Sequence, residues 1–480
     1  MSRPTPLRAL LDAVPRRYLM AGGIGAGGAD GHAAVLARVI ECLQLELAGG
    51  LEPGPPLRDA FVAALDGLIR EALRPRDGDP AFQAAVLAYR LPVVREYLAL
   101  NGGAAADRRK VQSVVDAQAH PRKPPRLGPG EARTWLAQLH AATAAQDWRR
   151  VAQLAQALAA RPEVAAIDDL ASALRALGGD PALIRLCRIE ALMRDPEVCR
   201  YRSIRAQLGP RAGSDEATAQ ARLARQRGTV VETQAAHALR AVAGYLNRLE
   251  GAAAASDASR YRVVTSLRVP SSLGADTDRA KTEWDAVLLR RVDPAAGSAQ
   301  AGATAALADL APLWDIRLVI EAKASVEAAT TDLPRLLRGL RLLARARPDQ
   351  VYAFSTQQGV VQVRGTSLAA LPVTEATLAE QVLYCSDAST NPPPAGLHAA
   401  SRAQLLSAPA CLAHGAALSE GRTASKDDLV PLWQALRHEA RWQPVLNLAA
   451  MRRLARSLMV HPDDVLVAVA RLSTLAGASA

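Results

Sequence analysis

The chain contains few aromatic residues and almost no lysine. Phe, Trp and Tyr make up 4% of the 480 residues. Few platforms are therefore present on which unpaired bases could stack, and base-by-base reading of single strands is not expected. Only five lysines occur, so arginine carries nearly all of the positive charge behind the net charge of +11. A basic surface attracts nucleic acid or an anionic membrane without sequence specificity, so the charge alone identifies no partner.

Cysteine and long apolar runs are also scarce. The five cysteines include no CxxC pair and their number is odd, so neither a disulfide framework nor a zinc knuckle is expected. No apolar run follows the N-terminal arginines, and no stretch approaches the ~18 uninterrupted apolar residues of a membrane helix. These absences predict a cytoplasmic protein with no membrane partner.

Several catalytic signatures are missing. The sequence contains no GxxxxGK[ST] loop, no HExxH and no GxSxG. These absences exclude a phosphate-binding loop of the motor kind, a zinc protease of the HExxH kind and a serine hydrolase with a nucleophile elbow. The run Gly23–Gly28 satisfies GxGxxG, but no clear strand precedes it and a long helix follows, so a flexible glycine loop is expected rather than a dinucleotide site.

Composition divides the chain into five segments. A region rich in proline, glycine and basic residues separates two helical blocks, and a proline-rich run opens a last helical region. The expected division is a helical region 1–115, a linker 116–130, a helical block 131–209, a mixed segment 210–390 and a helical region 391–480.

The second helical block contains a hairpin-like pattern. Residues 135–158 indicate two short amphipathic helices around Gln146-Asp147-Trp148. This pattern resembles one helical-hairpin repeat of the tetratricopeptide kind. Only one copy is plain, and arrays need several units to be stable, so a simple helical bundle is an equal alternative.

The mixed segment has its own order of elements. Apolar periodicity and β-branched runs predict a helix at 228–249, strands at 261–270, 282–292 and 314–325, a helix at 331–346, and extended stretches at 351–359 and 360–365. The expected fold class is therefore α+β and multidomain, with a central α/β domain flanked by mainly helical N- and C-terminal regions.

Charged residues lie at the ends of two of these strands. Side chains at positions i and i+2 share one face of a strand, so Glu321 and Lys323 project together after the apolar run 318–320. Glu283 and Asp285 likewise share a face of the preceding strand. Carboxylates placed close together repel each other unless a cation lies between them, and Mg²⁺ bound by one or two carboxylates would remove that conflict.

Asp285, followed one strand later by Glu321-x-Lys323, resembles the PD-(D/E)xK superfamily of restriction-endonuclease-like nucleases. The order helix, three strands, helix, strand is similar to that family over residues 229–359. The resemblance implies that Asp285, Glu321 and Lys323 are catalytic, and that Asp285, Glu321 and the backbone carbonyl of Ala322 bind Mg²⁺ or Mn²⁺. It also implies a further acid from the preceding helix, which Glu232 would supply.

Two features of the sequence depart from the family pattern. Trp284 stands where the motif has proline, and a low-complexity insert at 292–313 separates Asp285 from Glu321.

The implied function is hydrolysis of phosphodiester bonds in nucleic acid, with duplex DNA expected rather than RNA, and with defence or repair as fitting roles. The alternative is a non-catalytic nucleic-acid-binding or scaffold protein with a degenerate nuclease fold, so enzymatic activity stays open. Arg338, Arg341 and Arg345 form a stripe opposite Leu336, Leu340 and Leu343 that is predicted to contact phosphates, or else is a solvated basic face. The helical regions could bind a protein partner.

Overall fold

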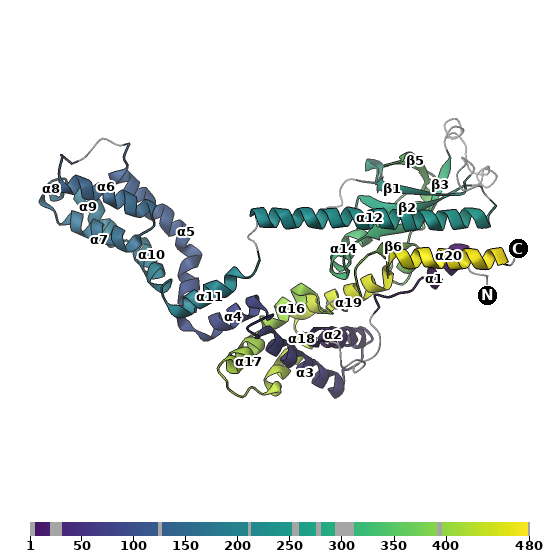
Figure 1. Ribbon diagram of the computed structural model, residues 1–480, viewed down its shortest axis with the longest axis horizontal. Helices are drawn as coiled ribbons and strands as arrows, with labels where there is room; N and C mark the ends of the chain where they lie inside the picture. The colour runs from purple at the N-terminus through teal and green to yellow at the C-terminus, as the bar shows by residue number, and fades with distance from the viewer. Residues whose placement is uncertain are drawn as a thin grey trace. The chain divides into compact units, whose positions relative to one another are not determined.

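The computed structural model describes residues 5–19, 31–122, 127–209, 213–251, 259–274, 280–292, 312–390 and 396–478 (Figure 1). The glycine run Gly23–Gly28 and residues 293–311 of the expected insert lie outside the described residues. The chain forms two compact units: unit 1 comprises residues 1–66, 210–404 and 430–480, and unit 2 comprises residues 67–209 and 405–429. Each unit is discontinuous in sequence, so the structure groups the chain differently from the linear series of five segments.

Unit 1 has the mixed α+β composition that was predicted, with a central sheet and with helices from both ends of the chain. Its main elements are α1 (Pro6–Ala13), α2 (His32–Ala48), α12 (Asp215–Leu249), β1 (Tyr261–Arg268), β2 (Glu283–Arg291), β3 (Leu313–Ala322), α14 (Val326–Leu343), β4 (Val351–Thr356), β5 (Gly359–Arg364), α15 (Gly365–Ala369), β6 (Val382–Cys385), α18 (Val430–His438), α19 (Gln443–Leu458), β7 (Met459–Val460) and α20 (Pro462–Ala478). Two helices, α3 (Pro55–Ala72) and α16 (Ala399–Leu406), cross the boundaries between the units.

The central sheet closes on itself. It has seven strands in the order β2-β1-β4-β5-β3-β6-β7, and β2 also pairs with β3. This additional pairing joins β2, β1, β4, β5 and β3 into a closed five-stranded barrel, with β6 and β7 continuing from β3. A nuclease-like sheet is open. The open, restriction-endonuclease-like sheet that the order of elements predicted is therefore not what the structure has.

The closure depends on few backbone contacts. β1 pairs with β2 along its whole length, whereas β1 meets β4 only where Arg268 faces Ser355. β5 meets β3 only at the start of β3, at Leu313 and Trp314. A strand pattern in the sequence predicts that a strand exists, but it carries little information about such brief pairings between distant segments.

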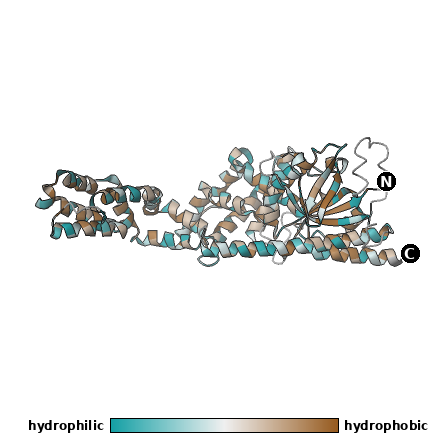
Figure 2. Ribbon diagram, turned by 90° about the horizontal axis from the view of Figure 1, so that it is seen from above, coloured by the Kyte–Doolittle hydropathy of each residue, from teal (hydrophilic) through white to brown (hydrophobic). Residues whose placement is uncertain are grey.

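Two hydrophobic cores cover the two sides of the sheet. Val287 and Leu289 of β2 join a core with α14 and α19, whereas Ala286 and Leu288 join a core with α1, α12 and α20. Figure 2 shows brown, hydrophobic stretches along strands and helix faces in this unit. The sheet is therefore covered by helices from the start, the middle and the end of the chain.

Helix α12 is longer than the sequence predicted. Ser214 caps it by accepting a hydrogen bond from the Ala217 N–H at 3.1 Å, and acidic residues occupy the first turn, where the helix dipole favours them. Almost all side chains from 215 to 230 are exposed, whereas the buried residues begin at Val231. The apolar periodicity on which the prediction relied exists only in the packed half of the helix.

Unit 2 is helical in the parts that the structure describes. Its helices are α4 (Pro80–Arg90), α5 (Pro92–Ala119), α6 (Glu131–Ala144), α7 (Trp148–Ala159), α8 (Pro162–Ala165), α9 (Asp168–Gly178), α10 (Pro181–Leu192), α11 (Pro196–Ala206) and α17 (Pro409–Ser419). Asp-Pro pairs start α4, α10 and α11, because the aspartate side chain accepts backbone N–H bonds and proline fits the first helical turn. Helix α5 continues to Ala119, so the first four residues of the expected linker 116–130 are helical.

The search for membrane-spanning helices found none among the residues that the structure describes.

Candidate active site

The antiparallel pairing of β2 with β3 brings the predicted catalytic residues together. Asp285 Oδ2 accepts a hydrogen bond from the Ala322 N–H at 2.8 Å. Glu321 and Lys323 share a face, and Lys323 Nζ lies 3.4 Å from Glu321 Oε2. The resemblance implies that the backbone carbonyl of Ala322 is a metal ligand. In the structure, it is the backbone N–H of Ala322 that contacts Asp285. Asp285, Glu321 and Lys323 therefore meet at one end of two adjoining strands.

Lys281 belongs to the same group, although the sequence pattern did not predict it as a site residue. Its ammonium group forms an ion pair with Glu321, whose side chain is fully buried, and Lys281 itself is 8% exposed. Its backbone N–H donates to the Arg335 carbonyl at 3.2 Å, and Gly339 leaves room for it, since a Cβ there would lie 2.8 Å from the Lys281 carbonyl oxygen. Lys281 precedes β2, so strand alternation could not place it. The one available signal was a rare lysine four residues before Asp285.

A third carboxylate completes the group. Asp332 of α14 lies 3.5 Å from Lys323 Nζ through its Oδ2, and the Tyr384 hydroxyl donates to the same oxygen at 3.3 Å. We call Lys281, Asp285, Glu321, Lys323 and Asp332 the acid–lysine cluster. It contains three carboxylates and two ammonium groups, so its formal charge is negative when all five are ionised.

The pKa shifts agree with a surplus of negative charge. Burial and then Asp285 raise the pKa of Glu321 to about 8, against the opposing effect of Lys281 and Lys323. Burial acts to lower the pKa of Lys281, but Glu321, Asp285 and Asp332 outweigh it and the pKa is raised. Burial, followed by Asp332 and Glu321, also raises the pKa of Tyr384. Glu321 and Lys281 therefore hold their protons tightly, as expected where negative charge is in excess.

A polar cleft of about 570 Å³ opens beside the cluster. Asp285 and Lys281 line it from β2 and the segment before it, and Glu232, Thr229 and Arg240 line it from α12. Partial burial and then Asp285 raise the pKa of Glu232. The structure thus places Glu232 near Asp285, on the part of α12 that the sequence analysis selected. No direct hydrogen bond joins these two carboxylates among the described residues.

An irregular part of β1 forms another wall of this cleft. Ser266, which faces the cleft, has a φ of 53°, an unusual value for a residue other than glycine. Gln358 Oε1 accepts from the Thr265 N–H at 2.8 Å, and the Thr265 hydroxyl lies 2.7 Å from Gln357 Oε1. The turn between β4 and β5 therefore holds β1 in its distorted form.

Strand alternation also fails on β2 opposite this distortion. Trp284 packs in the same core as Val287 and Leu289, whereas strict alternation would place Trp284 with Ala286. Glu283 and Asp285 both line the cleft, as their shared face predicted, but this face does not continue into Val287 and Leu289, which lie in the core with Trp284. The pattern of apolar residues could not show a twist between Trp284 and Val287.

The predicted arginine stripe lies outside the cleft lining. Arg341 and Arg345 are exposed and Arg338 is half-buried, whereas Leu336, Leu340 and Leu343 on the opposite face of α14 are fully buried. Arg335 lies one turn before Arg338 and does line the cleft. The stripe therefore begins at a cleft residue that the sequence analysis missed, and it continues along α14 away from the cleft.

The donor atoms of the acid–lysine cluster partly match the ligands that a divalent metal ion needs. Glu321 Oε1 is buried and has no hydrogen-bond partner among the described residues, so one carboxylate oxygen is available to a ligand. However, within the described ranges no group of three or more His, Cys, Asp or Glu side chains is arranged to hold a metal ion. The donors fit Mg²⁺ or Mn²⁺ held by one or two carboxylates and waters, and they do not form a complete protein cage.

Comparison of the chain with protein-family models, with curated proteins and with solved structures finds no match.

Proposed function

We propose that this protein is a divalent-metal-dependent nuclease that hydrolyses phosphodiester bonds in nucleic acid, with the acid–lysine cluster as its active site. The observation that carries the proposal is the fully buried Glu321, whose Oε1 has no hydrogen-bond partner among the described residues, beside Asp285 and Lys323 and next to a polar cleft. Leaving a buried carboxylate oxygen without a partner costs free energy, and such a cost is typical of functional sites.

The proposed roles follow from position. Asp285 and Glu321 would hold Mg²⁺ or Mn²⁺, with Glu232 as a further acid from α12. A bound ion would polarise a phosphoryl oxygen and lower the pKa of a bound water. Lys323 lies within 3.5 Å of both Glu321 and Asp332, and its ammonium would neutralise charge that develops on the phosphate. Lys281 would hold Glu321 in place through their ion pair.

The expected substrate is duplex DNA rather than RNA. Arg240 and Arg335 line the cleft, and guanidinium groups contact phosphate oxygens without reading sequence. The stripe Arg338, Arg341 and Arg345 would extend these contacts along α14. The scarcity of aromatic residues favours binding through the backbone over stacking on separated bases. DNA defence or repair would fit such an activity.

The finer fold assignment is part of this proposal. We infer that α12, the strands β1, β2 and β3, helix α14 and the parallel strand β6 correspond to the core of a restriction-endonuclease-like domain. The order of these elements and the parallel pairing of β3 with β6 support the assignment. The closed barrel is a departure from that fold, produced by the additional β4–β5 hairpin.

One observation favours the alternative, a non-catalytic nucleic-acid-binding or scaffold protein. The Lys281 ammonium lies against Glu321, and the described residues offer no group of three metal ligands. In a degenerate nuclease, two lysines could compensate the carboxylates permanently and the cleft would bind without cutting.

Substitution of Lys323 separates the two functions. Lys323→Met keeps the apolar stem and removes the charge, so we expect normal folding, nearly unchanged nucleic-acid binding, and cleavage reduced by roughly a hundredfold or more. Cleavage would be measured on duplex DNA, single-stranded DNA and RNA with Mg²⁺ or Mn²⁺. Lys426→Met, which removes an exposed lysine of unit 2, is the control and should cut normally.

Two results would contradict the proposal. Equal cleavage by Lys323→Met and the wild type would remove Lys323 from catalysis. Absence of cleavage by the wild type with every substrate and metal would support the binding alternative.

A further inference from the structure

Unit 2 contains its own cleft, which the proposed nuclease site does not use. It has a volume of about 910 Å³ and lies between α5 and the turn that joins α6 to α7. Arg108, Arg109 and Arg122 contribute guanidinium groups, and Gln146 and Trp148 line it from the turn. The turn is the Gln146-Asp147-Trp148 segment of the hairpin that the sequence analysis selected.

The three arginines of this cleft are not neutralised. None of them forms an ion pair within the described residues, and the buried Nε of Arg108 has no hydrogen-bond partner there. Other charged residues of α5 do form ion pairs: Asp107 pairs with Arg185 at 2.6 Å and Glu96 pairs with Arg188 at 2.6 Å. Arg108 and Arg109 of α5, together with Arg122 just after α5, thus bring three guanidinium groups without ion-pair partners among the described residues to the border of the cleft.

The one acidic side chain in the cleft lining already has partners. Asp116 Oδ1 accepts from Gln112 Nε2 at 2.8 Å and lies 3.3 Å from His140 Nε2. The His120 ring packs edge-on against the His140 ring, with centroids 5.5 Å apart. Asp116 keeps its negative charge in these contacts, so it offsets only one of the three guanidinium groups, and the cleft lining carries a formal charge of +2 when the histidines are neutral.

The turn between α6 and α7 gives the cleft a fixed boundary. Gln146 has a φ of 59°, and its N–H donates to the Thr143 carbonyl at 3.0 Å, while the Asp147 N–H donates to the Ala142 carbonyl at 3.0 Å. Asp147 also caps α7 through the Arg150 N–H at 3.0 Å. These bonds satisfy the backbone of the turn, so the Gln146 side chain remains available to a ligand.

We propose that this cleft binds the phosphate backbone of nucleic acid, as a second contact outside the nuclease site. Three guanidinium groups across an open cleft match several phosphates of one polymer better than a single small anion. The choice of nucleic acid over other phosphate-bearing polymers rests on the proposed function of unit 1. The cleft increases affinity without reading sequence.

The test uses the full-length chain and a fluorescein-labelled DNA duplex, with a chelator present to prevent cleavage. The triple variant Arg108→Gln, Arg109→Gln and Arg122→Gln is compared with the control triple Arg200→Gln, Arg202→Gln and Arg205→Gln. The control removes the same charge from exposed positions on α11 in the same unit. Fluorescence anisotropy is recorded over a range of salt concentrations.

We expect the cleft triple to weaken binding at least tenfold at low salt and to reduce the salt slope by about three, since each phosphate contact contributes about 0.9 to it. The control triple should change affinity by less than about twofold. The single variant Arg122→Gln, at an exposed position after α5, should reduce the slope by about one. If the triple variant does not fold, the salt slope of this single variant still tests the proposal.

The remaining outcomes are also decisive. Equal weakening by both triples would show general charge attraction and overturn the proposal. Cleft-dependent binding of a phosphoserine peptide, with duplex binding unaffected, would overturn the assignment to nucleic acid. A wild type that cuts nothing, but whose duplex binding depends on the cleft arginines, would refute the nuclease proposal and support this one.

Discussion

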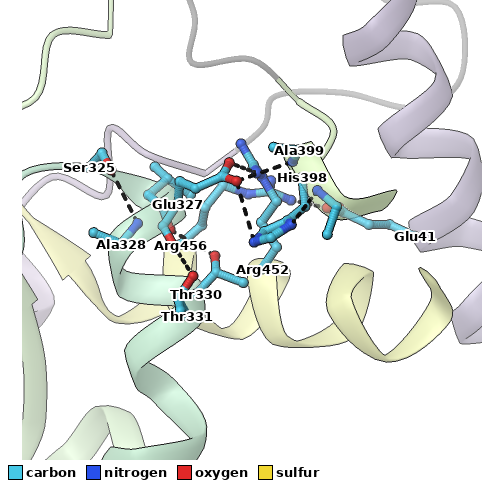
Figure 3. A network of polar contacts seen from close by, with 12 residues as sticks. Glu41, Ser325, Glu327, Ala328, Thr330, Thr331, His398, Ala399, Arg452 and Arg456 are labelled. Carbon is cyan, nitrogen blue, oxygen red and sulfur yellow. Dashed lines mark hydrogen bonds and ion pairs between the residues drawn. The ribbon is translucent and has the colours of Figure 1, made fainter. Parts of the chain in front are cut away.

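Two groups of charged residues in the described part of unit 1 differ in ways that bear on function. The acid–lysine cluster lies beside the cleft. The second group, which we call the α14–α19 ion network, consists of Glu41, Glu327, His398, Arg452 and Arg456 (Figure 3). It joins α2, α14, α19 and the start of α16. Arg452 and Arg456 are nearly as buried as Glu321, so burial alone does not distinguish a candidate active site from a structural one.

The carboxylates of the α14–α19 ion network are paired with cations and a backbone N–H. Glu327 accepts from the Ala399 N–H at 3.1 Å and from Arg452 at 3.3 Å, and it lies 3.4 Å from His398 Nε2. Arg456 forms an ion pair with Glu41 (Figure 3). The cavity beside the network has a volume of about 10 Å³, which is barely enough for one water.

The sign of the local charge differs between the two groups. Burial first, and then Arg456, lower the pKa of Arg452, as expected where cations crowd each other. In the acid–lysine cluster, burial and then Asp285 raise the pKa of Glu321, and the neighbouring carboxylates raise the pKa of Lys281 against the effect of burial. The acid–lysine cluster has an excess of negative charge, a carboxylate oxygen without a partner among the described residues, and an adjacent cleft, which together indicate a place for a cation. In the described residues, the α14–α19 ion network lacks these three features.

Breaking the α14–α19 ion network should cost stability rather than activity. Arg456→Met leaves Glu41, which is 12% exposed, without its charge partner. We expect the free energy of unfolding to fall by about 3–5 kcal/mol, with unchanged cleavage per folded molecule. Urea denaturation and a digestion assay would measure the two effects. Arg441→Met is the matched control, because its pair with Glu439 is exposed and should contribute about 1 kcal/mol or less.

Lys323→Met is expected to behave in the opposite way: cleavage should fall, whereas folding should stay normal. Loss of cleavage by Arg456→Met without loss of stability would show that the two groups are not distinct in function.

The raised pKa of Glu321 predicts a pH dependence of stability. Its folded-state pKa of about 8 exceeds the ordinary value of 4.5, so the folded protein binds this proton more tightly than the unfolded chain does. The resulting stabilisation is complete below about pH 4.5 and is lost as the pH rises toward 8. In metal-free protein, the free energy of unfolding should therefore fall across this range. Urea titrations at several pH values should show that Glu321→Gln flattens the fall, and an identical slope in the variant would disprove the assignment.

A smaller effect is expected at Glu232. The carboxylate interacts with Asp285 through space, and removing its charge should weaken Mg²⁺ binding by about tenfold with little effect on the melting temperature. Calorimetric titration with Mg²⁺ would measure the affinity. Glu216→Gln, in the exposed first turn of α12, provides the control. Unchanged affinity in Glu232→Gln would leave Glu232 with a structural role only.

The sequence predicted those parts of unit 1 that depend on local pattern. The strands β1, β2 and β3 appeared near their observed positions, because each is an apolar, β-branched run. The helix predicted at 228–249 lies within α12, where Ala236, Leu239, Ala243 and Leu246 recur at helical spacing and are buried. Asp285, Glu321 and Lys323 come together because antiparallel neighbours meet at one end.

The features that were missed depend on contacts between distant segments. β6 and β7 are too short to show a period, and they exist because each pairs with a neighbouring strand in parallel register. Lys281 is fixed by the Arg335 carbonyl and by the space at Gly339. The barrel closure relies on the single pair Arg268–Ser355 and on glutamine side chains, which no local periodicity encodes.

Helix α12 joins an exposed half to a packed half, and this has a consequence for hydrogen exchange. An isolated helix of the length of 215–230 is marginal in water, so these residues remain helical mainly because the packed turns after them continue the same hydrogen-bond ladder. Amide protection should therefore decrease steadily from Val231 toward Asp215. Thr229 and Glu232 lie at the junction of the two halves, so a ligand in the cleft would raise the protection of turns that it does not touch.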